Sequence, residues 1–166
     1  MIKKLISRDL IVIIRRFIKE DLSQVLELCR EVRQLHINLL GGYFTQQNDE
    51  FEKSGFLHSI ENDETIALVA TDNKKICGYL LAERKFSPYL ENPNIVHIIN
   101  FGVKTEIRGQ GIGKKLMDYL MEICKETDIN EIRLGVFNKN ISAYKFYEQY
   151  GFEPFEQRMN LQIKKT

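Results

Sequence analysis

The sequence predicts an α/β (α+β) fold built around one mixed sheet with helices packed against it. Two observations carry this prediction. Segments rich in β-branched residues alternate along the chain with segments whose apolar residues recur at helical spacing. No linker, repeat or low-complexity tract interrupts the 166 residues, so a single domain is expected over 1–166, with a core from about residue 10 to residue 164.

The first part of the chain predicts one strand followed by two helices. A β-branched stretch over 10–17 predicts the strand. Asp21 is suited to cap a helix that ends at Gly41-Gly42. Apolar residues recur at helical spacing within it, at Leu22, Val25, Leu26, Cys29, Val32 and Leu39. A second helix is expected over about 49–60, weakened by Gly55.

The rest of the chain predicts a hairpin and then alternating strands and helices. The expected elements are strands over 65–71 and 76–86 joined by a turn at 72–75, a strand over 95–103, a helix over about 111–127, a strand over 132–137, a helix over 142–150 and a strand over 155–163. The strand over 95–103 is apolar on both faces, which predicts an internal position in the sheet.

Composition argues against a nucleic-acid partner and against a membrane span. The formal net charge is +1, and basic residues are interleaved with acids instead of forming the stripe typical of nucleic-acid binding. The longest apolar stretch near the N-terminus runs only from Leu10 to Ile14, which is too short for a signal-peptide core or a membrane span. A cytoplasmic protein is therefore expected.

Cysteine and histidine spacing predicts neither a disulfide nor a metal site. The cysteines form no C-x-x-C pair, which indicates reduced core residues at Cys29, Cys77 and Cys124. The histidines show no H-x-x-x-H spacing and are scattered at His36, His58 and His97. No metal cofactor is expected.

A glycine-rich segment before the third predicted helix is the strongest local sign of a ligand. It reads I-R-G-Q-G-I-G-K-K-L-M from Ile107 to Met117. A helix N-terminus presents unpaired N–H groups and the positive end of the helix dipole, and glycines let an anion approach them closely. The spacing fits neither a Walker A loop nor a Rossmann fingerprint. On this segment alone, a glycine-rich connection without a ligand is an equally weighted alternative.

A second motif lies within Leu134–Phe152, and with the glycine segment it resembles the GCN5-related N-acetyltransferase (GNAT) superfamily. The family's acetyl-CoA motif, R/Q-x-x-G-x-G/A, is matched by Arg108, Gly111 and Gly113. Its second signature, N-x-x-A-x-x-F/L-Y-x-x-x-G-F, is matched by Asn140, Ala143, Phe146, Tyr147, Gly151 and Phe152. The expected element order also follows the family over nearly the whole chain. The chain looks similar to the branch that includes ribosomal-protein N-terminal acetyltransferases.

The resemblance implies a GNAT fold, with a mostly antiparallel sheet splayed between strands 4 and 5 and flanked by about four helices. It implies an enzyme that transfers the acetyl group of acetyl-CoA directly to a primary amine without a metal. The CoA pyrophosphate would be held by backbone amides of Arg108, Gly109, Gln110, Gly111, Ile112 and Gly113, with Lys114 adding charge.

The resemblance also assigns the end of the fourth strand to the pantetheine arm. Phe101, Gly102 and Val103 would pair with that arm, and the N–H of Val103 would polarise the thioester carbonyl. Gly102 suits a bulge or a close ligand approach. From the residues alone, these three are equally an ordinary buried strand.

Two residues of the second motif carry expected roles that each have a structural alternative. Tyr147 matches the tyrosine that would protonate the departing CoA thiolate, since a phenol with an ordinary pKa of about 10 is protonated at neutral pH. Its spacing alone favours a core aromatic. Asn140 would hydrogen-bond the pantetheine arm or its surroundings, and an N-cap for the following helix is equally compatible with its position.

His97 is the expected base for the acceptor amine. Histone-type members carry a glutamate six residues before the last apolar residue of the fourth strand, and counting back from Val103 gives His97. Ribosomal-protein acetyltransferases use a fifth-strand glutamate instead, where this chain has Gly135. Deprotonation is therefore assigned to His97 or to ordered water and backbone carbonyls. A core histidine satisfied by hydrogen bonds is equally weighted.

The acceptor itself is not specified by the sequence. The resemblance places an acceptor groove at Tyr43, Phe44 and Tyr89, with carboxylates at Asp49, Glu50 or Glu91 to attract a cation. A partly packed loop with a solvated acidic rim is the structural alternative. The expected partner is a small-molecule or peptide amine, and the family is compatible with a homodimer. A CoA-binding sensor or interaction module that has lost turnover is the alternative function.

Overall fold

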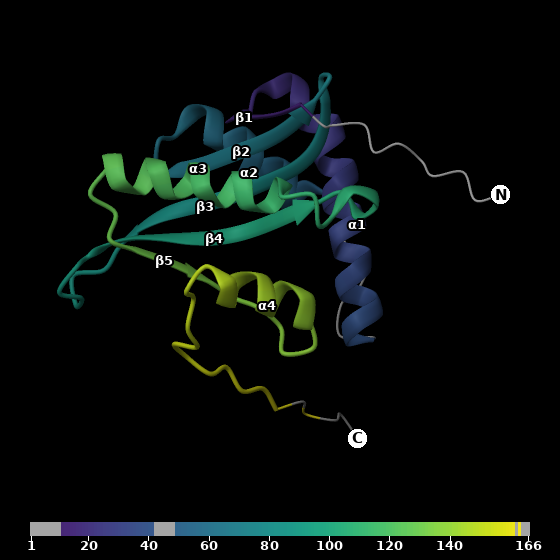
Figure 1. The fold of residues 1–166 in the computed structure, drawn as a ribbon. Coiled ribbons are helices and arrows are strands. Elements are labelled where there is room, and N and C mark those ends of the chain that lie inside the picture. The colour runs from purple at the N-terminus through teal and green to yellow at the C-terminus, as the bar shows by residue number, and fades with distance from the viewer. Residues whose placement is uncertain (1–10, 42–48, 162, 164–166) are drawn as a thin grey trace. The chain divides into compact units, whose positions relative to one another are not determined.

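The structure is a computed structural model that describes residues 11–41, 49–161 and 163. The chain divides into two compact units, Met1–Gly135 and Val136–Thr166, and each is described by itself. Among the described residues, the first unit contains all the strands and the second unit contains one α-helix (Figure 1).

The first unit is built on a five-stranded sheet with the spatial order β1-β2-β3-β4-β5. The strands are Val12–Arg16 (β1), Thr65–Asp72 (β2), Lys75–Phe86 (β3), Asn94–Val103 (β4) and Glu131–Leu134 (β5). The first four strands pair antiparallel with their neighbours, and β4 pairs parallel with β5. This arrangement confirms the predicted mixed, mostly antiparallel sheet.

β4 and β5 separate halfway along β4. Their pairing runs from Ile95 opposite Glu131 to Ile98 opposite Leu134, and among the described residues no strand pairs with β4 beyond that point on the β5 side. The register between β3 and β4 shifts at the same place, because Ala82 lies opposite Ile98 whereas Leu81 lies opposite Asn100. Ile99 is therefore the extra residue of a β-bulge. The splay expected between strands 4 and 5 is confirmed.

Helices cover both faces of this sheet (Figure 1). α1 (Leu22–Leu40) and α2 (Glu50–Glu61) lie on one face, where Val25, Val32 and Phe56 join a core cluster with Tyr79 and Leu81. α3 (Ile112–Glu126) lies on the other face, where Ile112 and Leu116 pack so closely on β3 that a Cβ at Gly78 would lie 3.1 Å from each side chain. Successive strand residues point to opposite faces, so odd-numbered β3 residues face α1 and α2.

Asp21 occupies the predicted N-cap position of α1, but its carboxylate does not cap the helix. It accepts hydrogen bonds from both terminal nitrogens of Arg15, at 2.6 and 2.8 Å, and from the N–H of Ile18 at 3.0 Å. Burial acts to raise the pKa of Asp21, but the bonds from Arg15 and Ile18 and the Arg15 charge outweigh it and hold that pKa below its ordinary value. The predicted cap is thus an ion pair that joins β1 to α1.

Two predicted strands differ from the structure. The strand expected over 132–137 ends at Leu134, just before Gly135, a residue that weakens strands. The strand expected over 155–163 is not formed in the described part of that range, 155–161 and 163. The alternation of apolar and polar residues there satisfies the side-chain pattern of a strand, but a strand also needs a neighbour for its backbone hydrogen bonds. The hairpin turn is shorter than expected, since Asp72 pairs directly with Lys75.

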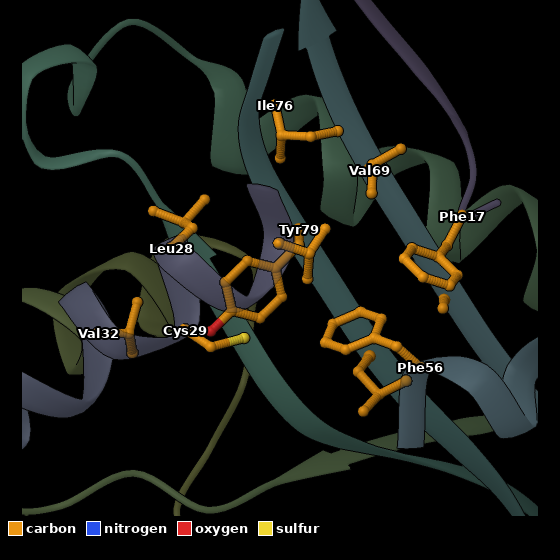
Figure 2. Packing of buried hydrophobic residues seen from close by; sticks show 11 residues of the cluster. Phe17, Leu28, Cys29, Val32, Phe56, Val69, Ile76 and Tyr79 are labelled. Carbon is orange, nitrogen blue, oxygen red and sulfur yellow. The ribbon is translucent and has the colours of Figure 1, made fainter. Parts of the chain in front are cut away.

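Tyr79 organises the core on the α1 and α2 face. Its side chain is 0% exposed, and Figure 2 shows the ring between Cys29 and Phe56 with the hydroxyl beside Cys29. A Cβ at Gly102 would lie 2.8 Å from Cε1 of Tyr79 and 2.6 Å from Cγ2 of Val32. Packing of α1 and Tyr79 over β4 therefore requires glycine here. Of the two expectations for Gly102, the bulge is wrong, because the bulge falls at Ile99, and the close ligand approach stays a prediction.

Replacing Gly102 with alanine tests this packing. We expect Gly102→Ala to lower the free energy of unfolding by about 1–3 kcal/mol, the usual cost of overpacking a core. Urea denaturation measures the change. Gly135→Ala is the matched control, because a Cβ there meets nothing within 4 Å. Its effect should stay within about 0.5 kcal/mol. Equal unfolding midpoints for the two variants would contradict the packing argument.

Candidate functional site

The glycine segment forms the turn that leads from β4 into α3. β4 ends at Val103, a 3-10 turn follows at Thr105–Ile107, and α3 begins at Ile112. Gly109 and Gly111 have φ angles of +77° and +78°, a region that favours glycine. A Cβ at either position would meet nothing within 4 Å. Backbone conformation, not packing, therefore requires glycine at both positions, and their main chain is exposed.

The first turn of α3 carries positive side chains at the end of the helix where the dipole is already positive. It contains no acidic residue and carries Lys114 and Lys115 instead. Cations are unfavourable at a helix N-terminus, where the dipole is already positive. Ile112 is only 1% exposed and anchors the start of the helix, so the lysines remain at the surface beside the exposed turn. Lys114 also pairs with Asp118 at 2.7 Å. The combination suits a multiply charged anion at this terminus.

Side chains tie this turn to its surroundings. Nε of Arg108 donates to the carbonyl oxygen of Val103 at 2.9 Å, which fixes the turn to the end of β4. The N–H and the hydroxyl of Thr105 both donate to the carboxylate of Glu31 on α1, the N–H at 2.7 Å. The turn is therefore held on two sides.

The N–H of Val103 points toward the open side of β4. The N–H of Lys104 donates to the carbonyl oxygen of Cys77 at 3.0 Å, so Gly78 and Val103 form a non-hydrogen-bonded pair of the antiparallel ladder. In such a pair, the N–H and C=O groups point away from the neighbouring strand. The bond from Arg108 to the Val103 carbonyl agrees with this direction. The Val103 N–H thus faces the side where β5 no longer pairs with β4.

His97 lies on the α1 and α2 face of β4, next to the splay. It is half-buried, with Glu83 of β3 and Arg133 of β5 opposite it in the register. Glu83 pairs with Lys85 at 2.6 Å, and Arg133 pairs with Glu131 at 2.5 Å. His97 is therefore the central member of a polar row across three strands, and it is not enclosed in the apolar core.

The second unit contains α4 (Ile141–Gln149), and Asn140 forms its N-cap. The side-chain oxygen of Asn140 accepts a hydrogen bond from the N–H of Ala143 at 3.2 Å. This confirms the N-cap alternative that the sequence left open. The expected role of Asn140 toward the pantetheine arm stays a prediction.

The Y-x-x-x-G-F part of the second motif ends α4 as a Schellman motif. The N–H of Phe152 donates to the carbonyl oxygen of Tyr147 at 3.2 Å, and the N–H of Gly151 donates to that of Glu148 at 2.9 Å. Gly151 has the required left-handed backbone, with φ of +83°. The rings of Tyr147 and Phe152 lie 5.6 Å apart, which is the hydrophobic contact typical of this motif. Burial raises the pKa of Tyr147 to about 12.

Only one of the three expected acceptor residues lies in the described part of the chain. Tyr43 and Phe44 lie outside the described residues, while Tyr89 is 95% exposed in the connection between β3 and β4. Asp49 binds Arg30 at 2.8 Å and Arg33 at 3.4 Å, so its carboxylate joins α1 to α2. Its expected use as an attractor for a cationic acceptor is not supported, because two cations already neutralise it.

The cysteines, the potential metal ligands and the helices of the described residues bear on the remaining sequence-based expectations. Its three cysteines are buried, as predicted, and without disulfides. Burial raises the pKa of Cys29 to about 12 and that of Cys77 to about 11, so neither thiol ionises at neutral pH. Within residues 11–41, 49–161 and 163, no three His, Cys, Asp or Glu side chains gather as metal ligands. In the same residues, no helix is both long and apolar enough to cross a membrane.

The fold and the exposed turn are those expected of an acetyltransferase of the GNAT family, and comparison with known proteins gives the same family. The family model described as "Acetyltransferase (GNAT) family" matches residues 26–152. The chain belongs to this family.

Individual relatives extend the comparison. An uncharacterised N-acetyltransferase of Methanocaldococcus jannaschii is 26% identical over 145 residues, covering 86% of this chain and 61% of the relative. A Bacillus subtilis relative, a candidate ribosomal protein bS18-alanine N-acetyltransferase, is 36% identical over 63 residues, covering 38% and 42% of the two chains. The chain thus spans less than two thirds of the length of these relatives.

Solved structures share the fold along nearly their whole length. A mutant of the BH1408 protein from Bacillus halodurans superposes with a TM-score of 0.82 at 26% identity, covering 92% of this chain and 99% of the other. The aminoglycoside N-acetyltransferase AAC(6')-Iy in complex with CoA superposes with a TM-score of 0.72, covering 96% and 99%. Its 17% identity supports a shared fold alone.

Proposed function

We propose that this protein is an acetyl-CoA-dependent N-acetyltransferase that acetylates a primary amine of a small molecule or peptide. Its two units are proposed to form one domain over 1–166, and the cytoplasmic location expected from the sequence stays a prediction. One observation carries the proposal. An exposed turn suited to a diphosphate follows directly on Val103, whose N–H faces the open side of β4.

The coenzyme is proposed to bind along the turn and the adjoining end of β4. Main-chain N–H groups from Gly109 to Gly113 would hold the pyrophosphate, because the left-handed Gly109 and Gly111 turn the backbone without side chains. The N–H of Arg108, which was also expected to bind, donates to the carbonyl oxygen of Thr105 at 3.4 Å instead. The lysines of the first turn of α3 add positive charge to a helix end where the dipole is already positive. Residues 101–103 would then line the pantetheine arm.

The Val103 N–H is proposed to stabilise charge on the thioester oxygen. Attack of the amine nitrogen on the thioester carbon forms a tetrahedral intermediate with a negative oxygen, and a fixed backbone donor stabilises that charge. Collapse of the intermediate breaks the carbon–sulfur bond, and the nitrogen, positively charged after the attack, releases its extra proton to solvent. The products are a neutral amide and the CoA thiolate. Arg108 holds the other polar group of Val103, its carbonyl oxygen, at 2.9 Å, which restrains the backbone next to this donor.

The acceptor amine must lose a proton before it attacks, since lysine-type amines have pKa values of about 10.4 and α-amines of about 8. His97 is the proposed base, and its half-buried place beside the splay supports this role. Deprotonation through ordered water and backbone carbonyls is the alternative.

Tyr147 is proposed to donate to the departing sulfur. Its pKa of about 12 keeps the hydroxyl protonated at neutral pH. That value lies above the pKa of about 8.5 typical of a thiol, so complete proton transfer to the thiolate is unfavourable. A hydrogen bond from the phenol to the developing thiolate is the better description of this role.

Release of CoA on mixing the protein and acetyl-CoA with a panel of amines tests the proposed function. Polyamines, aminoglycosides, amino acids and N-terminal peptides cover the main acceptor chemistries. Turnover with at least one of them is expected. Binding of acetyl-CoA without turnover across the panel would favour the sensor or interaction module instead.

A charge placed in the turn should prevent coenzyme binding. Gly111→Glu brings a negative side chain to the proposed pyrophosphate site, and we expect acetyl-CoA affinity to fall at least about tenfold in calorimetry. Gly111→Ala is the control, because it imposes the same strain at a φ of +78° without the charge. Unchanged affinity in the glutamate variant would refute this location of the site.

Removal of the Tyr147 hydroxyl should affect turnover alone. We expect Tyr147→Phe to lower kcat at least about tenfold, while the Kd for acetyl-CoA changes little. Tyr144→Phe changes a tyrosine of the same helix that has no assigned role and should keep full kcat. Full activity in Tyr147→Phe would remove the proposed donor.

Loss of the His97 imidazole should change the pH dependence. In His97→Ala, we expect the acidic limb of the pH profile of kcat/KM to disappear or shift, because the group that accepts the proton is gone. His58→Ala, on α2, should leave the profile unchanged. An unaltered profile in His97→Ala assigns deprotonation to water and backbone carbonyls.

A further inference from the structure

We propose that Asn100 binds the acceptor amine through its side-chain N–H2 group, which donates to an oxygen a few bonds from the reacting nitrogen. Tyr79 is the positioning residue that orients this amide. The inference rests on the proposed function and deepens it, since it names the chemical class of the acceptor: an amine with a neighbouring carbonyl or hydroxyl oxygen.

The bulge in β4 places Asn100 beside His97. Residues three apart on a regular strand point to opposite faces of a sheet. Here Ile99 is the extra residue, so His97 lies opposite Glu83 and Asn100 lies opposite Leu81. Glu83 and Leu81 are two residues apart on β3 and share a face, which separates the two positions on β4 by roughly 7 Å. One small acceptor can therefore reach both side chains.

Tyr79 fixes which end of the Asn100 amide is available. The Tyr79 hydroxyl donates to Oδ1 of Asn100 at 2.8 Å. Its ring is fully buried between α1, α2 and β4, so the hydroxyl position is set by core packing. With the oxygen of the amide used by Tyr79, the two N–H bonds of Nδ2 remain on the other side of the amide as donors. Asn100 is half-buried, so this side is not sealed in the core.

Cys29 supports the same orientation of the Tyr79 hydroxyl. Figure 2 shows the Cys29 sulfur beside this hydroxyl. Burial raises the pKa of Cys29 to about 12, so the group is a thiol that can donate its S–H to the tyrosine oxygen. The single O–H of Tyr79 is then directed to Asn100. Gly102 completes the arrangement, because a Cβ there would occupy the space of the Tyr79 ring.

The chemistry of the site selects among amines. Amide N–H groups bind carbonyl and hydroxyl oxygens, and a site that provides such a donor discriminates against analogues that lack the oxygen. The neighbouring charged groups of the row, Glu83 and Arg133, already pair with Lys85 and Glu131. Asn100 is thus the neutral donor next to the proposed base. Amino amides, peptide N-termini and amino alcohols meet its requirement, and plain alkylamines do not.

The test compares two acceptors of similar size in several variants. L-Alaninamide carries the oxygen, and sec-butylamine lacks it. The two amines differ in basicity, so their absolute rates are not compared. The quantity to follow is kcat/KM for L-alaninamide divided by kcat/KM for sec-butylamine, and this ratio is compared between wild type and each variant. Asn100→Asp keeps an oxygen for Tyr79 and removes the N–H donors. We expect it to lower the ratio about tenfold, the worth of one hydrogen bond.

Two further variants separate orientation from a general structural effect. Tyr79→Phe should lower the same ratio by a smaller factor, because the amide is still present but no longer held. Asn130→Asp makes the same chemical change at an exposed site between α3 and β5 and should leave the ratio unchanged. Calorimetric affinity for acetyl-CoA should be the same in all variants.

The outcomes distinguish the role of Asn100 from the proposed acetyltransferase function. An unchanged ratio in Asn100→Asp, or a best acceptor in the amine panel that has no oxygen near its amine, would overturn the role of Asn100 while acetyl transfer stands. Absence of CoA release with every amine would instead overturn the proposed function. A tenfold loss for L-alaninamide with little change for sec-butylamine would establish the inference.

Discussion

The structure depends on one interruption of backbone pairing, the point where β4 loses β5 as a neighbour. A strand inside a sheet uses its N–H and C=O groups on both sides, but β4 pairs with β5 only as far as Ile98. The bulge at Ile99 falls at the same place. Together they open one side of β4 toward Val103 and bring His97 and Asn100 to one face. The proposed coenzyme and acceptor sites both follow from this interruption.

Packing on both faces keeps the interrupted strand in place. Tyr79 and Val32 press on Gly102 from one face so closely that no Cβ fits between them. On the other face, α3 rests on β3 at Gly78. A strand with an unpaired side would otherwise be free to pair with another chain. Here the close packing, together with the Arg108 and Glu31 bonds around the turn, holds the end of β4 in place.

The sequence predicted the fold well because hydrophobic periodicity and turn residues report local structure. The order of the elements as far as α4, the internal position of β4 and the start of α3 all follow from such patterns. Contacts between residues far apart in the sequence could be predicted less well. The segment over 155–163 has the alternation of a strand, but periodicity does not say whether a neighbouring strand is present. Asp21 was expected to cap α1, and only the structure shows Arg15 turned toward it.

In the candidate site, too, the local motifs were predicted and the contacts between separate elements were not. The glycine turn and the Y-x-x-x-G-F motif are contiguous in the sequence and have local physical reasons, a left-handed backbone and a Schellman motif. Asn100 was missed, because its contact with Tyr79 joins two strands, and its place on the same face as His97 depends on a bulge that no residue type indicates. Arg30 and Arg33 were missed as partners of Asp49 for a similar reason.

The central claim is that acetyl-CoA occupies the turn and the open side of β4 through main-chain donors. Amide hydrogen exchange followed by NMR, with and without acetyl-CoA, tests it most directly. Slower exchange on binding is expected at Val103, Gly111, Ile112 and Gly113, since their N–H groups would gain acceptors. Exchange that is unchanged at these four amides, with protection elsewhere in the chain, would contradict it.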